Sequence, residues 1–393
     1  MAVVFVIAGR LLGIAELYAF AVVGLGLTAG AMLYVRYAPW QIDARREVRP
    51  PQVHAGGHGR VELSVTNMDS HRSPVLSARD PFDNGRRWAR FHIAPLPPGD
   101  RVRAAYRLPT EQRGIFPLGP LLIGLTDPFG LATQARESAP TASLTVFPRI
   151  DTIRPLPQAR GADPNGSTGS PSLTAGGDDF YALRPYQTGD DLRRVHWPSL
   201  ARSDELMIRQ DELPWQGRVS VLADIRAPIH TPASLELVLS AVASIIHAGW
   251  TARRQVRLVG TDGSDSGFGS GHTHLSAILG RLAAIDVGPQ RTLSAGLSAL
   301  NRGGTTGAIA VVTTANSADN DLAAIRRLSA RFGLVALVVV EESAWDPSVP
   351  VRSASMARGR AQVIRVTGDR PFAVAWNAAV ARPPGLAEAR ATR

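Results

Sequence analysis

The sequence predicts a multi-domain protein with three folded parts. These are an N-terminal transmembrane helix or helical hairpin, a β-sandwich of immunoglobulin type, and an α/β domain with a doubly wound sheet. Three observations carry this prediction. Residues 17–35 carry no charge and are about as long as a bilayer core is thick. Residues 45–150 contain short β-type runs separated by Pro and Gly, whereas residues 217–382 alternate strand-like and helical runs.

Residues 1–37 are expected to hold the transmembrane segment or segments. Residues 1–12 are apolar, but they are interrupted by Arg10 and are too short to span a bilayer as a helix. A signal peptide is the less favoured alternative, because no basic region precedes the first apolar run. Arginines follow the second apolar run at Arg36, Arg45, Arg46 and Arg49. The positive-inside rule therefore predicts that the bulk of the protein is cytoplasmic.

Composition excludes several classes of chemistry. The chain has no cysteine, so disulfides, thiolate catalysis and zinc–thiolate sites are ruled out. All 43 basic residues are arginine, which rules out a P-loop NTPase and a lysine Schiff base. The net charge is +10, but the arginines are scattered and aromatic residues make up only 6% of the chain. We therefore expect no nucleic-acid partner.

The β-rich region, residues 45–150, is predicted to hold strands within residues 61–67, 89–96, 100–108, 119–127 and 142–149. Loops are expected at residues 67–70 and 97–100. The Asp127-Pro128-Phe129-Gly130 string is most simply a turn, because Pro128 fixes φ and Gly130 permits a positive φ. An alternative is that Phe129 is an exposed docking knob.

Residues 158–177 are rich in Gly, Ser and Pro and are interpreted as a flexible linker. Residues 178–213, which we call the collar, follow it with a dense run of acids, arginines and aromatics. The collar is expected to form a loop, a short helix that Asp190 caps and Pro198 ends, and a strand at residues 205–210. It is interpreted either as a structural clamp of ion pairs and packed aromatics or as a partner-binding surface.

The α/β domain, residues 217–382, is predicted to begin with a strand at residues 218–225. A helix capped by Thr231 follows, with Pro232 in its first turn. Further strands are expected at residues 256–261, 308–314, 334–340 and, at an edge, 361–366, with helices at residues 273–285 and 322–331. Repeated βα units predict a mostly parallel sheet. Residues 383–393 are expected to be a disordered tail.

The string RPYQTGDDLRRVHWPSLARSDELMIRQ in the collar resembles the signature of the bacterial domain-of-unknown-function 58 family. A second match is RGIFPLGPLLIGLTDPFGL at Arg113–Leu131. The resemblance implies a von Willebrand factor A-like α/β domain, a membrane anchor, and a MoxR-type AAA+ ATPase as protein partner. The signature residues, which we expect to bind the partner, are Tyr186, Gly189, Asp190, Arg193, Arg194, Trp197, Ala201 and Arg202, with Val195 and His196 inside the pattern.

Domains of the von Willebrand type hold a metal on an Asp-x-Ser-x-Ser loop after the first strand. Here that loop is Asp224-Ile225-Arg226-Ala227-Pro228, which keeps the acid and loses both hydroxyls. Arg226 places a positive charge where a cation would bind. We therefore treat Asp224 as a degenerate metal-site position, expect no metal and no cofactor, and predict that Asp224 pairs with Arg226 or with a collar arginine.

Two other sets of residues suggest a metal site and a catalytic base, but the sequence supports both interpretations less well. His272 and His274 have the spacing of a metal pair but lie in a Gly/Ser-rich loop. His196 with Asp190 or Asp191 is a conceivable base, yet a helix would separate them and no GxSxG nucleophile motif exists. The chain is therefore predicted to be a non-enzymatic, membrane-anchored adaptor. The alternative is a metal-dependent hydrolase or metal-regulated binding protein that uses Asp178, Asp179, Asp190 and Asp224.

Overall fold

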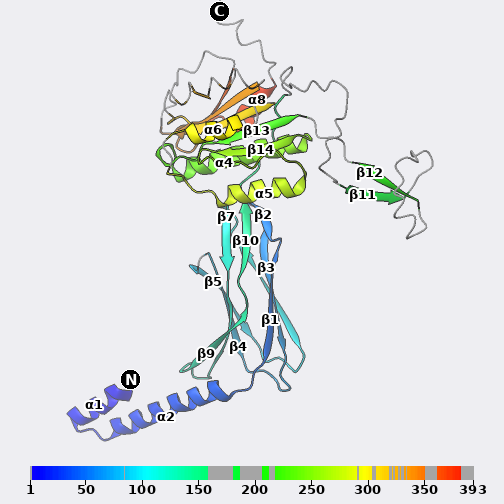
Figure 1. Cartoon of the computed structure of the whole chain (residues 1–393). Helices are drawn as coiled ribbons and strands as arrows, with labels where there is room; N and C mark the ends of the chain where they lie inside the picture. Colours follow the sequence, from blue (N-terminus) through cyan, green and yellow to red (C-terminus); the bar gives the residue numbers. More distant parts are fainter. Residues whose placement is uncertain are drawn as a thin grey trace, which may run out of the picture. The chain divides into compact units, whose positions relative to one another are not determined.

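The computed structural model describes residues 2–83, 85–157, 180–185, 206–211, 217–289, 292–302, 307–317, 334–349 and 361–381, together with residues 321, 324, 325, 328 and 332. The chain divides into two compact units, Met1–Phe147 and Pro148–Arg393 (Figure 1). The first unit contains two helices and three antiparallel or mixed sheets, and the second contains a parallel sheet with helices.

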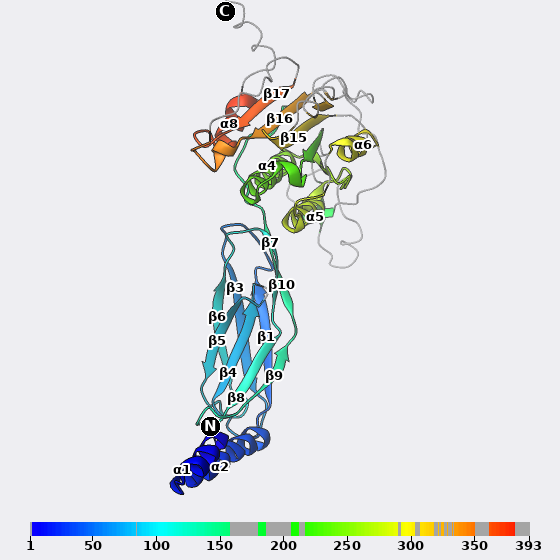
Figure 2. The same cartoon turned by 90° about the vertical axis from the view of Figure 1, so that its left-hand side faces the viewer.

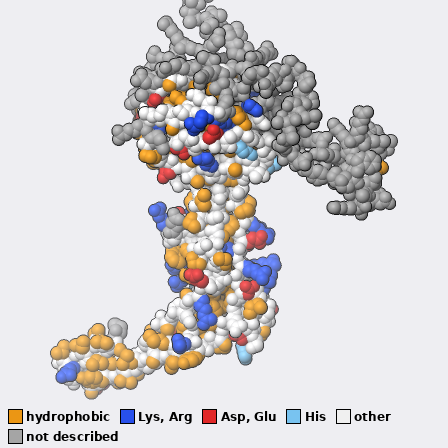
Figure 3. All heavy atoms as spheres, in the orientation of Figure 1, with side chains coloured by type: hydrophobic (Ala, Val, Ile, Leu, Met, Phe, Trp, Pro, Cys, Tyr) orange, Lys and Arg blue, Asp and Glu red, His pale blue; other side chains and the backbone are white. Residues whose placement is uncertain are grey.

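The chain begins with two apolar helices, α1 (Ala2–Leu12) and α2 (Glu16–Tyr37). They pack on each other through Phe5 and Phe20, whose ring centroids lie 6.0 Å apart. Hydrophobic side chains cover both helices in Figure 3. Helix α2 is long and apolar enough to cross a membrane, while α1 is shorter, as expected from its sequence. Only 17% of the apolar window of α2 is buried, so most of its apolar surface faces outward.

The remainder of the first unit is built from β-strands. Three sheets have the strand orders β1-β3-β6, β5-β4-β8-β9 and β2-β10-β7. The five strands expected from the sequence are confirmed, and five more polar or shorter ones join them. The bounds are β1 Ile42–Arg49, β2 Gln52–His54, β3 Gly59–Asn67, β4 Leu76–Phe82, β5 Arg87–Ile93, β6 Arg101–Leu108, β7 Gly114–Leu118, β8 Leu121–Thr126, β9 Thr133–Ala139 and β10 Ala142–Phe147.

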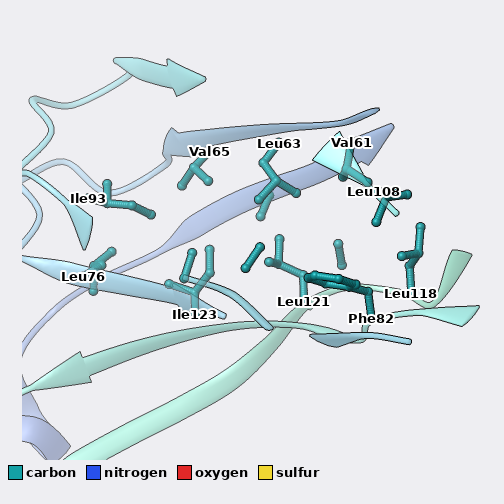
Figure 4. Close-up of a cluster of buried hydrophobic side chains, with 14 of the residues drawn as sticks. Val61, Leu63, Val65, Leu76, Phe82, Ile93, Leu108, Leu118, Leu121 and Ile123 are labelled. Carbon is teal, nitrogen blue, oxygen red and sulfur yellow. The ribbon is translucent and has the colours of Figure 1, made fainter. Parts of the chain in front are cut away.

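The core of this unit lies between the facing sheets. Strand β3 alternates buried and partly exposed residues, which places Val61, Leu63 and Val65 on the inner face. Figure 4 shows these side chains opposite Leu76 and Ile123 of the β5-β4-β8-β9 sheet. Period-2 alternation in the sequence therefore packs one face of each sheet and leaves the other face polar.

One buried ion pair interrupts this apolar core. Arg46 Nη1 lies 2.6 Å from Asp80 Oδ1, and the two side chains are almost completely buried. The Tyr106 hydroxyl donates to Asp80 Oδ2 at 2.8 Å. Burial, followed by the charge of Asp80, raises the pKa of Tyr106 well above its usual value. Gly119 approaches the guanidinium with φ +84°, so the Arg113–Leu131 motif contributes the backbone that closes over this ion pair.

The second unit is organised around a five-stranded parallel sheet, in the order β14-β13-β15-β16-β17. Its strands match the predicted ones and β17 lies at an edge, as expected. They are β13 Arg218–Ala223, β14 Gln255–Gly260, β15 Ala308–Thr314, β16 Leu334–Val340 and β17 Gln362–Val366. Numbered from β13, the order is 2-1-3-4-5. This is a doubly wound order whose direction reverses between β13 and β15. Figure 2 shows β15, β16 and β17 side by side in this sheet.

Helices α4 (Pro232–Thr251), α5 (Gly271–Ala284), α6 (Ser294–Arg302) and α8 (Phe372–Val380) belong to this unit. Thr231 caps α4 as predicted, because its hydroxyl accepts from Ser234 N at 3.2 Å. Helix α4 is also long and apolar enough to span a membrane, but 67% of its window is buried, so it is a core helix. The predicted helix at residues 322–331 lies mostly outside the described residues.

Residues 148–157 belong to the α/β unit. Asp151 N donates to Ser244 Oγ on α4 at 2.9 Å, and Trp376 Nε1 on α8 donates to Arg154 O at 2.7 Å. Leu156 is buried. These bonds fasten the segment after β10 to two helices of the second unit.

The collar is described only in part. Strands β11 (Phe180–Pro185) and β12 (Met207–Asp211) form an antiparallel pair, so the strand predicted near residue 207 is present. The short helix predicted between them lies outside the described residues. So do Asp178, Asp179 and all eight signature residues from Tyr186 to Arg202.

Candidate functional site: a buried arginine at the strand ends

The candidate site lies where the parallel sheet reverses its strand order. Asp224 directly follows β13, and Thr313 lies near the carboxyl end of β15. In open α/β sheets this switch point is the usual place for a ligand, because the loops of neighbouring strands diverge there. The polar groups at these two strand ends are therefore the natural candidates for function.

Arg226 occupies the centre of this site. Its Nε donates to Asp224 Oδ1 at 2.8 Å and its Nη2 donates to Asp224 Oδ2 at 2.8 Å, a bidentate pair. Its Nη1 donates to Asp321 Oδ2 at 2.8 Å. The Asp224 side chain is fully buried and that of Arg226 is 2% exposed, while that of Asp321 is 20% exposed. The predicted pairing of Asp224 with Arg226 is confirmed, and Asp321 is a second carboxylate that the sequence did not reveal.

Two hydroxyls complete the cluster. Thr313 Oγ1 donates to Asp224 Oδ2 at 2.7 Å, and it lies 2.6 Å from Ser317 Oγ. Arg226 Nη2 also reaches Ser317 Oγ, at 3.4 Å. The Asp224 carboxylate therefore accepts from a guanidinium on one side and a hydroxyl on the other, which satisfies a buried charge.

The loop that carries Arg226 is fixed by its backbone. Gly288 N donates to Ile225 O at 2.7 Å, and Ala227 N donates to Gly288 O at 2.8 Å. Ile225 N donates to the hydroxyl of Thr261, at the end of the neighbouring strand β14. The loop that carries the guanidinium is therefore held by the segment at Gly288 and by Thr261, which follows β14.

His230 also stabilises this loop, through a hydrogen bond to its backbone. Its Nε2 lies 2.6 Å from Asp224 O, so Nε2 carries the proton and donates to this carbonyl. Its Nδ1 lies 3.2 Å from Ser234 Oγ. Burial lowers the pKa of His230. The hydrogen bond to the Asp224 carbonyl and the Asp224 charge act in the opposite direction, and the Arg226 charge adds the smallest effect, which lowers the pKa. Both ring nitrogens are committed to these contacts, so the imidazole is a neutral structural group.

The charge balance explains why Arg226 stays protonated. Burial alone lowers its pKa, but the hydrogen bonds and charges of Asp224 and then Asp321 raise the pKa above its usual value overall. Among the described residues, no group of three or more His, Asp or Glu side chains converges to hold a metal ion. The positively charged group between the two carboxylates belongs to the protein itself.

The other candidates from the sequence do not join this cluster. His274 Nε2 bonds to Val256 O at 3.0 Å, whereas the His272 ring meets the edge of Trp250 at 4.6 Å between centroids. Both residues lie in the first turn of α5 rather than in a loop, and their side chains serve separate contacts. Asp321, Thr313, Ser317 and His230 were missed. The hydroxyl pair at the end of the apolar run 308–314 could have pointed to Thr313, but no local signal pointed to the other three.

The pH dependence of stability is expected to report on His230. Because the folded state lowers its pKa, His230 contributes stability above the ordinary histidine pKa of about 6.5. That contribution is lost as pH falls through the lowered folded value. Each unit of lowering corresponds to about 1.4 kcal/mol. Urea unfolding between pH 8 and pH 5 should show a steeper loss for the native chain than for His230→Gln, which keeps an N–H donor. Equal slopes would refute this role.

The fold and the site define a class of protein: an apolar helical hairpin, a β-sandwich, and a parallel α/β sheet whose switch point is filled by a buried arginine. Residues 182–352 match the model of a family described as "Protein of unknown function DUF58". The resemblance carried by the collar is confirmed. No curated protein matches the chain.

Solved structures match the chain only in part. One is the CARDB domain of the PF1109 protein from Pyrococcus furiosus, in complex with di-metal ions. It is 14% identical, covers 28% of this chain and 96% of its own, and has a TM-score of 0.23. A β-glucosidase from Listeria innocua is 9% identical, with 27% of this chain and 16% of its own length covered and a TM-score of 0.19. A GH3 β-glucosidase from Bifidobacterium adolescentis is 12% identical, with 27% and 17% covered and a TM-score of 0.19.

Proposed function

We propose that this protein is a non-enzymatic adaptor anchored in the bacterial inner membrane, with its soluble bulk in the cytoplasm. The observation that carries the proposal is the Arg226 guanidinium between Asp224 and Asp321, at the place where such sheets bind ligands. A cation built into the protein removes the need for a bound metal. It also leaves the strand ends as a fixed surface rather than a reaction centre.

The anchor is the helical hairpin at the N terminus. Helix α2 exposes apolar side chains along its length, including Phe20, Val22, Val23, Leu25, Met32 and Leu33. Exposed apolar surface of this extent is stable in lipid rather than in water. Arg36 in the last turn and the arginines of β1 follow the helix, which supports a cytoplasmic position for the rest of the chain.

In this proposal the sandwich is immunoglobulin-like and the α/β unit is a von Willebrand factor A-like domain without its metal. The collar is the partner surface, with Tyr186, Arg193, Arg194 and Trp197 as its main anchors, since Arg and aromatic residues dominate interface energies. The resemblance implies a MoxR-type AAA+ ATPase as the partner. It further implies a role in assembling or maturing envelope or metal-dependent complexes.

A capture experiment tests the partner. The full chain in lipid nanodiscs is expected to retain a purified MoxR-type ATPase from the same organism. Arg194→Glu and Trp197→Ala should each weaken binding at least tenfold, the cost of losing about 1.4 kcal/mol at an interface anchor. Arg103→Glu, on an exposed position of β6, is the charge-matched control and should bind like the native chain. Failure to retain the ATPase, or equal loss in the control, would remove the partner assignment.

Titration calorimetry separates the adaptor from a metal-dependent hydrolase. With Mg²⁺, Mn²⁺ or Ca²⁺ the native chain should give no micromolar binding, because Asp224 is already neutralised by Arg226. Micromolar binding that Asp224→Ala abolishes would favour the metal-dependent alternative.

A further inference from the structure

One end of the β-sandwich carries loops from both facing sheets. Strands β1, β3 and β6 end together there, with Ile42 paired to Asn67 and Thr66 paired to Arg101. In the other sheet, Thr126 pairs with Thr133 at the same end, next to the Leu76–Leu125 pair. Asn67, the last residue of β3, bonds to the loop that follows β5, because its Nδ2 donates to Leu96 O at 2.8 Å. We call loops 67–75, 94–100 and 127–132 the α2-side rim.

Helix α2 enters the sandwich at this rim. It ends at Tyr37, and Trp40 is already buried in the sandwich core three residues later. Gln41 O then accepts from Met68 N at 2.8 Å, inside the first rim loop. The Arg136 guanidinium, near the start of β9, lies 4.7 Å from the centre of the Trp40 ring. The segment that joins α2 to β1 therefore contacts the first rim loop and β9, at the end of the sandwich where Figure 1 shows α2.

Large apolar side chains project from the rim. Phe129 is 71% exposed and Met68 is 61% exposed, and Val75 and Leu131 are exposed beside them. Elsewhere in the described part of the β-sandwich, residues 42–147, only Trp88 and Ile115 are large apolar residues with comparable exposure. Scattered single apolar residues are ordinary on a protein surface, but a concentration at one end calls for a contact.

The rim holds these side chains in fixed turns. Asp127 accepts from Phe129 N at 2.8 Å and from Ala132 N at 2.6 Å, and Gly130 adopts φ +72°. The turn predicted for this string is therefore present, with Phe129 outside it as a knob. Asn67 fixes the other loop, since its buried amide donates to His71 O and its Oδ1 accepts from Asp69 N. Such fixed turns present apolar groups to a surface with little ordering cost.

Exposed arginines accompany the apolar groups. Arg36 lies in the last turn of α2, Arg72 in the first rim loop, and Arg101 at the start of β6. Aromatic and aliphatic side chains interleaved with arginine suit the headgroup region of a membrane with anionic lipids. Continuity with α2 favours lipid over a protein partner, since Met32, Leu33 and Tyr34 expose apolar surface up to the same junction.

We propose that the α2-side rim rests on the membrane interface, with Phe129, Leu131, Met68 and Val75 inserted among the lipid headgroups. This inference rests on the proposed membrane anchor, and it assigns a second, independent lipid contact to the sandwich. The β-sandwich would then contact the bilayer directly through this rim, in addition to its covalent connection to α2.

The absence of cysteine makes a clean test available. Phe129→Cys, Leu25→Cys and Ile115→Cys each create one labelling site, and all three native side chains are exposed. Leu25 lies in α2, and Ile115 lies on β7, away from the rim. Each full-length variant is labelled with an environment-sensitive fluorophore. It is then reconstituted in phosphatidylethanolamine–phosphatidylglycerol nanodiscs containing lipids with a nitroxide close to the headgroup.

Nitroxide quenching reports lipid contact. We expect quenching and a blue shift at positions 129 and 25, and neither at position 115. Quenching at 25 without quenching at 129 would overturn the rim contact and leave the anchor standing. The absence of quenching at all three positions would overturn both the rim contact and the anchor. Equal quenching at 115 and 129 would also overturn the proposal, because the contact would not be specific to the rim.

Discussion

Replacing Arg226 by methionine is expected to destabilise the α/β unit by about 3–5 kcal/mol. The side chain is almost fully buried and neutralises both Asp224 and Asp321. Methionine keeps most of the volume but removes the charge and the donors, so a fully buried carboxylate loses its counter-ion. Urea unfolding of the full chain in detergent, followed by hydrogen exchange of β13 and β15, measures the loss in this unit.

Two further variants give this experiment its control. Arg281→Met removes an exposed arginine on α5 and should change stability by less than about 0.5 kcal/mol. Adding Asp224→Asn to Arg226→Met should recover part of the loss, because one of the two uncompensated carboxylates disappears. If Arg226→Met behaves like Arg281→Met, the guanidinium is not the central support of this sheet edge.

Gly119→Ala is expected to destabilise the β-sandwich by about 3–5 kcal/mol. Gly119 has φ +84°, a region that side chains other than glycine rarely adopt. An added Cβ would lie 2.6 Å from Arg46 Nη2 and closer still to Nη1. Moving the Arg46 guanidinium away would be costly, because it would leave the buried Asp80 without its charge partner. Urea unfolding with hydrogen exchange of β3 and β8 measures the effect.

Gly85→Ala is the matched control for Gly119→Ala. Gly85 has a similar φ of +78°, but no atom lies within 4 Å of an added Cβ. The free energy of unfolding of Gly85→Ala should therefore fall only by the cost of the backbone strain, of order 1–2 kcal/mol. Equal losses for the two variants would show that the ion pair at Arg46 tolerates displacement.

The strands that the sequence revealed are those whose apolar pattern is set by burial on the sheet. Strands β15 and β16 are buried along almost their whole length and appear as unbroken apolar runs. Strands β1 and β9 were missed because they lie at sheet edges and expose charged residues. Strand β4 was missed because it carries Asp80 inward and contains Pro81, both unfavourable signals for a strand.

The residues of the candidate site also differ in whether the sequence could reveal them. Asp224 and Arg226 are two residues apart on one loop, so their pairing was predictable from the chain itself. Asp321 lies 95 residues from Arg226, and Thr313 lies 89 residues from Asp224, so only the fold brings them together.

The sequence by itself determined the order of the parts: the apolar helices, the β-rich region, the collar and the parallel α/β unit. It did so because burial imposes a period of two or a continuous apolar run on strands, and a period of about 3.6 or a long apolar run on helices. Only the tertiary structure decided that Asp321 shares the guanidinium, that Gly119 closes over Arg46, and that Phe129 stands on the rim where α2 arrives. These facts depend on strand order and register, which join distant residues and leave no local pattern in the chain.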